Sequence, residues 1–180
     1  YDVDLNGAGA NMPYTVYEAE KESTNAVVLP KSTTYRTDIQ SEASERSAVK
    51  LSNTGDYVEF TLEKAANAMV IRYCIPDSSD GTGLDTSLSM YMNGTKRQDL
   101  SLTSKYAWIY GGYPYTNSPS DGNAHRFFDE SRVFFTDGTL EKGTTIRLQK
   151  DNKDNAQYYI IDFIECELVE SAASKPENSL

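Results

Sequence analysis

Apolar and polar residues alternate along much of the chain with the period of two that a half-buried β-strand requires. The clearest case is 57–62 (YVEFTL), where polar residues separate Val58, Phe60 and Leu62. A longer and more apolar run, 68–75 (AMVIRYCI), ends at a proline and predicts a more deeply buried strand. These patterns favour β-sheets over helices.

Turn-forming residues separate the strand-like runs at short intervals. The sequences NTGD at 53–56 and NG at 93–94 are typical of tight turns between neighbouring strands. One candidate helix, 63–68, is too short to be convincing. Further strands are expected at 14–20, 26–29, 48–51, 87–92, 98–102, 126–135, 144–149 and 158–169. About ten short strands spaced by roughly 8–12 residues predict an all-β fold, an antiparallel β-sandwich of the jelly-roll kind.

The chain is expected to form one domain with polar extensions. Its 180 residues are enough to bury a substantial core. Residues 1–13 and 171–180 are predicted to be linkers, and 14–170 the β-sandwich. Because the chain starts at Tyr1 without a Met or a targeting segment, we expect a mature or excised piece.

Composition excludes some partners and favours others. The net charge of −10 argues against nucleic acid, whose phosphates would be repelled. No apolar run approaches the roughly 20 residues of a membrane span. The 13 tyrosines are typical of an extracellular, secreted β-protein, and exposed aromatic rings can stack on sugars. Acidic side chains also favour hard cations such as calcium.

The two cysteines, Cys74 and Cys166, each lie at the end of a predicted strand. Two cysteines provide neither a spacing signature nor a metal motif. A disulfide is one alternative, but two buried thiols are favoured.

Glu18 and Glu20 lie one residue apart in the strand predicted at 14–20. Positions i and i+2 of a strand share a face, so the two carboxylates repel unless a positive group lies between them. A catalytic pair, a cation site and two solvated glutamates are the alternatives. First and last strands often pair in such a fold, which would bring Asp162 close.

Four motifs occur in order along the chain: VYEAE at 16–20, GDYVEF at 55–60, IRY at 71–73 and IDFI at 161–164. This order resembles that of carbohydrate-binding modules of the family 6 and family 35 type, over residues 14–169. Three middle stretches, SLTSKYAWIY, HRFFDE and IRLQKD, are similar to one branch of these modules. That branch is attached to parallel β-helix polysaccharidases, notably α-1,3-glucanases and mycodextranases of glycoside hydrolase family 87.

The resemblance implies a structural calcium between the first and last strands. Glu18 and Glu20 match the two N-terminal acidic ligands, and Asp162 matches the C-terminal one. The family also takes oxygens from the loop that corresponds to 42–46 here, where its members commonly carry Gly. This chain has no Gly in that loop, and Ser44 and Arg46 are the loop residues that complete the predicted ligand set.

The resemblance also implies sugar contact at the loops 77–85, 106–123 and 151–158. Trp108 is similar in position to an aromatic platform, although within YAWIY it could equally be a core residue. The other aromatic candidates are Tyr110, Tyr113 and Tyr115. The candidates for hydrogen bonds to sugar hydroxyls are Asp80, Asp85, Asn117, Asn123 and Asn155. The 77–85 loop could hold a second cation, but it lacks EF-hand spacing, and a turn-forming loop is favoured.

Catalysis is not expected from these residues. A glycosidase needs two carboxylates flanking the bond, and Glu18 and Glu20 share one strand without an evident pocket. His125 is the only histidine, and no Gly-x-Ser-x-Gly motif is present. The sequence therefore predicts a non-catalytic, monomeric carbohydrate-binding module. It would be tethered to a catalytic domain and would bind a glucan, with α-1,3-glucan or a related polymer favoured. The alternative is a structural β-sandwich packed on a catalytic β-helix, which would bury the aromatic candidates rather than expose them.

Overall fold

The computed structural model describes residues 14–126 and 128–170 of the chain. The linkers predicted at 1–13 and 171–180 lie outside these residues. The described part is built of β-strands, as the alternating pattern predicts, and an all-β fold with antiparallel sheets is confirmed.

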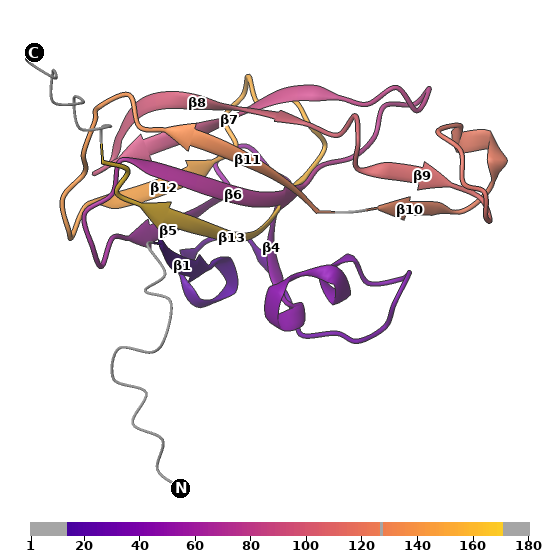
Figure 1. The fold of residues 1–180 in the computed structure, drawn as a ribbon, viewed down its shortest axis with the longest axis horizontal. Coiled ribbons are helices and arrows are strands. Elements are labelled where there is room, and N and C mark those ends of the chain that lie inside the picture. Colours follow the sequence, from indigo (N-terminus) through magenta and orange to yellow (C-terminus); the bar gives the residue numbers. More distant parts are fainter. Residues whose placement is uncertain (1–13, 127, 171–180) are drawn as a thin grey trace, which may run out of the picture.

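The first sheet has six antiparallel strands in the order β11-β6-β13-β4-β3 (Figure 1). β1 pairs with the second half of β13, whose first half pairs with β4. The first and last strands are therefore neighbours, as expected. The strands are β1 (Tyr14–Glu18), β3 (Val27–Leu29), β4 (Ala48–Leu51), β6 (Ala68–Cys74), β11 (Asp129–Phe134) and β13 (Tyr159–Glu167).

The second sheet has five antiparallel strands in the order β2-β5-β12-β7-β8. The Asn93-Gly94 turn joins its two longest strands into a hairpin, as its sequence predicts. The strands are β2 (Ser23–Thr24), β5 (Tyr57–Thr61), β7 (Asp85–Met92), β8 (Thr95–Thr103) and β12 (Thr145–Gln149).

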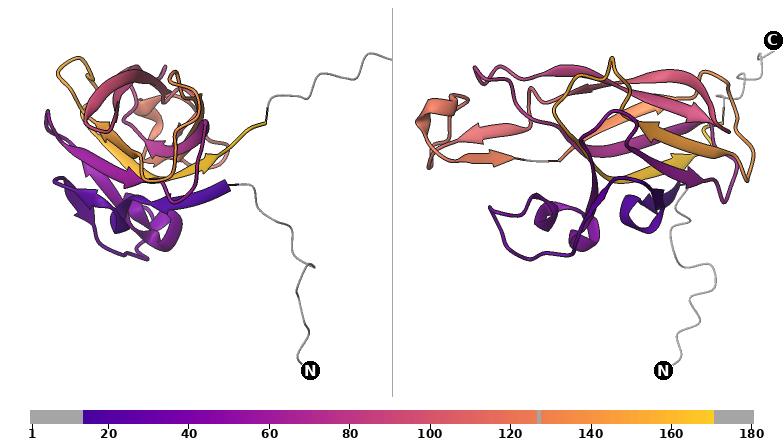
Figure 2. Two further views of the ribbon diagram at one scale, coloured as in Figure 1. Left: turned by 90° about the vertical axis from the view of Figure 1, so that its left-hand side faces the viewer. Right: turned by 180° about the vertical axis from the view of Figure 1, so that it is seen from behind.

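A two-stranded hairpin of β9 (Trp108–Tyr110) and β10 (Ala124–Arg126) projects beyond the ends of both sheets (Figures 1 and 2). Four short 3₁₀ turns complete the fold, namely η1 (Ala19–Lys21), η2 (Ile39–Glu42), η3 (Ser44–Arg46) and η4 (Pro119–Asp121). No helix among residues 14–126 and 128–170 has the length and apolar character needed to cross a membrane.

One core lies between the two sheets. Phe60, Leu88 and Ile146 of the second sheet pack in the same buried cluster as Ile71 and Ile161 of the first. The residues predicted to face inward at 58, 60 and 62 are at most 1% exposed. Alternation along the sequence therefore identified the inner faces correctly.

Two predicted strands have different limits in the structure. The strand expected at 14–20 ends at Glu18, and Glu20 belongs to η1. The strand expected at 126–135 corresponds to two elements, because β10 pairs with β9 while β11 pairs with β6. The alternation of apolar and polar residues does not show which strand a segment pairs with. The sequence therefore predicted one continuous strand where the pairing partner changes.

The two cysteines are free and buried, which confirms the favoured prediction. They lie on opposite faces of the first sheet. Cys166 packs in the core between the sheets, whereas Cys74 belongs to a smaller outer cluster with Ala43, Ala48 and Ile160. Burial raises the pKa of each thiol to about 12.

Candidate functional site

Asp162 lies in a β-bulge of β13, where the register against β6 shifts between Ile161 and Phe163. The bulge inserts one extra residue, and the Asp162 side chain is fully buried. Both carboxylate oxygens accept the backbone N–H of Ser44 at 3.0 Å, and Oδ2 also accepts Nη1 of Arg72 at 2.8 Å. Burial raises the pKa of Asp162 to about 7, although the Ser44 N–H and Arg72 act in the opposite direction.

Ser44 connects the last strand to the first. Its hydroxyl donates to Oε1 of Glu18 at 2.7 Å, while its N–H binds Asp162. Glu18 Oε2 and both Glu20 carboxylate oxygens are buried without a hydrogen-bond partner. Burial raises the pKa of Glu20, and the negative charges of Glu18 and Glu45 raise it further. Unpartnered buried oxygens of this kind are costly unless a positive group meets them.

These three unpartnered carboxylate oxygens fit a hard cation such as calcium, which prefers oxygen ligands. The oxygens of Asp162 are already engaged by Ser44 and Arg72. Among the residues that the structure describes, no group of three or more His, Cys, Asp or Glu side chains lies close enough to hold a metal ion. Glu18 and Glu20 are therefore the better candidates, and Asp162 positions Ser44 beside them.

The loop before β4 has the backbone that glycine favours, without glycine. Glu45 and Arg46 have φ values of 51° and 60°, a left-handed conformation that costs a non-glycine residue roughly 1 kcal/mol. Lys21 pairs with the Glu45 carboxylate at 2.7 Å, and the Arg46 carbonyl accepts the N–H of Ser32 at 3.1 Å. In the loop where the family commonly has Gly, this chain therefore places two non-glycine residues, Glu45 and Arg46, in a strained conformation.

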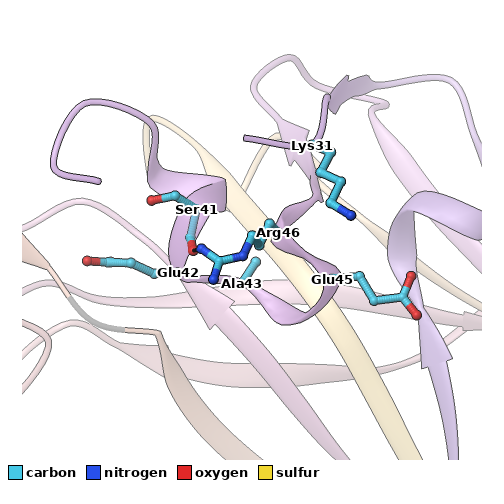
Figure 3. Close-up of a pocket in the computed structure, with 6 residues that line it drawn as sticks. All are labelled: Lys31, Ser41, Glu42, Ala43, Glu45 and Arg46. Carbon is cyan, nitrogen blue, oxygen red and sulfur yellow. Dashed lines mark hydrogen bonds between the residues drawn. The ribbon is translucent and has the colours of Figure 1, made fainter. Parts of the chain in front are cut away.

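A cavity of about 380 Å³ lies on the outer side of this loop (Figure 3). The Arg46 side chain extends toward Ser41 and Glu42, and its Nη1 donates to the Ser41 carbonyl at 3.4 Å. The Glu45 carboxylate points to the other side. The guanidinium of Arg46 has only donors, so Arg46 can offer a cation nothing but its backbone carbonyl.

The aromatic residues of the predicted platform divide into buried and exposed members. Trp108 is half-buried, and its indole N–H donates to the Ile75 carbonyl at 3.0 Å. Tyr110 is 7% exposed and donates its hydroxyl to Asp77. These two side chains anchor the hairpin to the body of the protein. The aromatic platform around Trp108 stays a prediction.

Tyr113 and Tyr115, in contrast, are 91% and 47% exposed near the end of the same hairpin. They stand edge to face, with ring centroids 6.5 Å apart. Tyr115 and Asn123 line a cavity of about 350 Å³. Its remaining lining residues are Arg36, Gly111, Gly112, Asp121, Gly122 and His125.

The polar side chains predicted to bind sugar hydroxyls do not form one cluster. Asp80 accepts bonds from Ser78 and Thr82 within its own loop, and these bonds lower its pKa to about 2. Asp85 pairs with Lys105 at 2.9 Å.

Asn155 accepts the hydroxyl of Thr86 at 2.8 Å. Asn117 is exposed, and its backbone carbonyl lies against Gly81. Asp80, Asp85 and Asn155 are thus engaged in bonds to other side chains of the protein, and Asn123 lines a cavity beside the exposed ring of Tyr115.

Sequence reasoning missed several residues that the structure brings to these sites. Arg72 pairs with Asp162 across 90 residues of chain, and no short motif signals such a pair. His125, Asp121 and Arg36 meet around Tyr115. The one available signal was that a lone His lies in an otherwise polar and aromatic segment.

Comparison with known proteins shows where this chain belongs. The family model described as alpha-1,3-glucanase catalytic domain D1 matches residues 11–169. This chain belongs to that family. No similar sequence was found among the curated proteins.

Several solved structures are similar to the chain. The crystal structure of the Agl-KA catalytic domain is 33% identical with a TM-score of 0.85, over 96% of this chain and 30% of that one. The catalytic domain of a GH87 alpha-1,3-glucanase in complex with nigerose is 32% identical with a TM-score of 0.82, over 95% and 31%. The GH87 alpha-1,3-glucanase catalytic unit from Streptomyces thermodiastaticus strain HF3-3 is 33% identical with a TM-score of 0.75, over 96% and 29%. The chain therefore spans about three tenths of these catalytic domains.

These findings correct the interpretation of the chain as a carbohydrate-binding module of the family 6 and family 35 type. The family model and the similar structures are those of catalytic domains. The four motifs that suggested the module lie mostly on strands that form the sheets, and one fold can serve many functions. The association with α-1,3-glucanases agrees with the family match.

The expectation that the chain is non-catalytic, whether as a binding module or as a structural sandwich, is also wrong. The family model and the similar structures are those of catalytic domains. These domains are more than three times as long as the matched region, so catalytic carboxylates need not all lie within these residues.

Proposed function

We propose that this chain forms part of the catalytic region of a secreted glycoside hydrolase that cleaves α-1,3-glucan. The observation that carries the proposal is the family match over residues 11–169, nearly the whole of the described chain. The catalytic domain of a similar GH87 alpha-1,3-glucanase was solved in complex with nigerose, which supports a glucan as the partner. The remaining part of the catalytic region would be tethered to this chain in one monomeric polypeptide.

The sheet order supports a further assignment, to the jelly-roll type of sandwich. The chain passes from β4 in the first sheet to β5 in the second, back to β6 and again to β7. Strands that change sheet at successive connections are a feature of jelly rolls. We therefore propose that the two sheets form a jelly roll.

The test is hydrolysis by the full-length protein that contains this chain. It should release reducing sugar from insoluble α-1,3-glucan, with far less release from dextran, laminarin or xylan. Dextran, laminarin and xylan are also polysaccharides, but each differs from α-1,3-glucan in its linkage or its sugar unit. They therefore serve as matched controls. Equal release from all of them, or none from α-1,3-glucan, would refute the proposal.

A structural calcium is proposed at Glu18 and Glu20. The support is that three of their four carboxylate oxygens are buried without a partner. Ser44 and backbone carbonyls of the 42–46 loop would complete the oxygen set, since calcium takes six to eight ligands. When bound, the ion would supply the positive charge that these acids lack.

A further inference from the structure

We propose that the cavity near the end of the β9–β10 hairpin is a sugar-binding subsite that holds one glucose unit of the glucan substrate. The proposal rests on the proposed function, and it adds a place on this chain where the polymer is bound. The cavity has a volume of about 350 Å³, within the range of small-molecule sites. Its lining residues come mainly from the β9–β10 hairpin, which projects beyond the ends of both sheets (Figure 2).

One wall of the cavity is aromatic. The ring of Tyr115 packs against His125 with centroids 5.0 Å apart and an interplanar angle of 61°, and it remains 47% exposed. The more exposed Tyr113 stands perpendicular to it. A pyranose ring presents C–H groups on its faces, so it can pack on an aromatic ring that is held in place but still open to solvent.

The other walls carry both hydrogen-bond donors and acceptors. Asn123 offers an amide that does both, Arg36 only donates, and the Asp121 carboxylate only accepts. Sugar hydroxyls also donate and accept, so a mixed lining of this kind suits a neutral carbohydrate better than a phosphate or a simple cation.

The floor of the cavity requires glycine. A Cβ on Gly111 would lie 2.9 Å from the Asp121 carbonyl oxygen, and one on Gly122 would lie 3.1 Å from the Gly111 Cα. Both residues have positive φ, 83° and 138°. The two backbone segments can approach this closely because neither glycine carries a Cβ.

The hairpin is fixed rather than loose. Tyr110 and Thr116 exchange two backbone hydrogen bonds, at 2.8 and 3.1 Å, and the Gly111 N–H donates to the Asn123 carbonyl at 3.1 Å. At its base, Trp108 is tied to the Ile75 carbonyl. A subsite held in one geometry before binding loses less free energy when it orders the ligand.

The experiment compares variants of the full-length protein on long and short substrates. Tyr115→Ala and Asn123→Ala should each raise KM for α-1,3-glucan about three- to tenfold, the value of one aromatic or polar contact. The rise in KM should be larger on the polymer than on short α-1,3-linked oligosaccharides, which make fewer contacts along the binding site. Tyr106→Ala is the matched control, because Tyr106 is 86% exposed and lies outside the cavity.

Three outcomes would overturn the subsite. Both variants could match Tyr106→Ala in KM; both could lose activity equally on long and short substrates; or Tyr115→Ala could unfold the protein while Asn123→Ala leaves KM unchanged. The second result would indicate that the hairpin docks on the rest of the catalytic region. If the wild type does not hydrolyse α-1,3-glucan, the proposed function falls. The subsite is then decided by depletion of each variant from solution by insoluble α-1,3-glucan.

Discussion

At Glu18 and Glu20, three carboxylate oxygens are buried without a partner in the protein. Calcium should therefore stabilise the fold, because an ion bound only by the native state adds its binding free energy to stability. In calcium at 100 times its Kd, the melting temperature should exceed that in EDTA by about 5 °C or more. Differential scanning calorimetry provides the measurement.

Glu20→Gln should remove most of this difference, because an amide is a weaker ligand than a carboxylate. Glu22→Gln is the control, since Glu22 is a nearby acid whose oxygens are not among the unpartnered ones. An identical melting temperature with calcium and with EDTA in the wild type would count against the site.

At this scale the sequence predicted that the first and last strands pair, and Glu18 and Asp162 on these strands both bind Ser44. It could not predict Arg72 as the partner of Asp162, or the hydroxyl of Ser44 as the link to Glu18. Those contacts depend on how a bulge and a loop meet. Local patterns carry no information about such geometry.

At the scale of elements, Asp162 in the bulge of β13 connects this strand to β6 and η3. Its buried carboxylate accepts hydrogen bonds from Arg72 of β6 and from Ser44 of η3. Asp162→Ala should lower the free energy of unfolding by about 3 kcal/mol, because it leaves the Ser44 N–H and Arg72 without their acceptor. Arg132→Met is the control. It breaks the more exposed Arg132–Glu167 pair between β11 and β13 and should cost less than about 1 kcal/mol.

The loss in Asp162→Ala should depend on pH. The pKa of Asp162 is raised in the folded protein to about 7 from its usual value of 3.8. The native state therefore holds a proton that the unfolded chain releases, and this stability is fully present below about pH 4 and declines as pH rises through about 7. Urea titrations in EDTA should show the difference between wild type and variant shrinking over that range. A difference that grows with pH would contradict the burial argument.

Element by element, the sequence pattern identified the strands of both sheets except β2, which has only two residues, and alternation identified the inner face of β5. It failed at β9 and β10, which are three residues each and pair only with one another. In so short a hairpin the burial pattern is set by Trp108 and Tyr110 anchoring to the body, not by a sheet face. The sequence at the exposed end of the hairpin therefore shows no alternation of apolar and polar residues from which its structure could be predicted.

At the scale of the whole molecule, two sheets share one core, and the sequence predicted this arrangement. The function was misjudged because fold and function are separable. Motifs such as GDYVEF supply core residues to a strand, since Val58 and Phe60 are fully buried, and they report on packing. The match to a catalytic-domain family rests on the chain as a whole.

The placement of the two thiols on opposite faces of one sheet makes them independent reporters of how the molecule opens. Cys74 is covered by a small cluster that includes Trp108, Phe128 and Tyr158, whereas Cys166 lies in the main core. Local fluctuations that move the side chains of this small cluster away should expose Cys74 to solvent without separating the two sheets. In pulsed alkylation followed by peptide mass spectrometry, Cys74 should be modified faster than Cys166, and Cys166 only at the rate of global unfolding. Equal rates would mean that cover and core open as one unit.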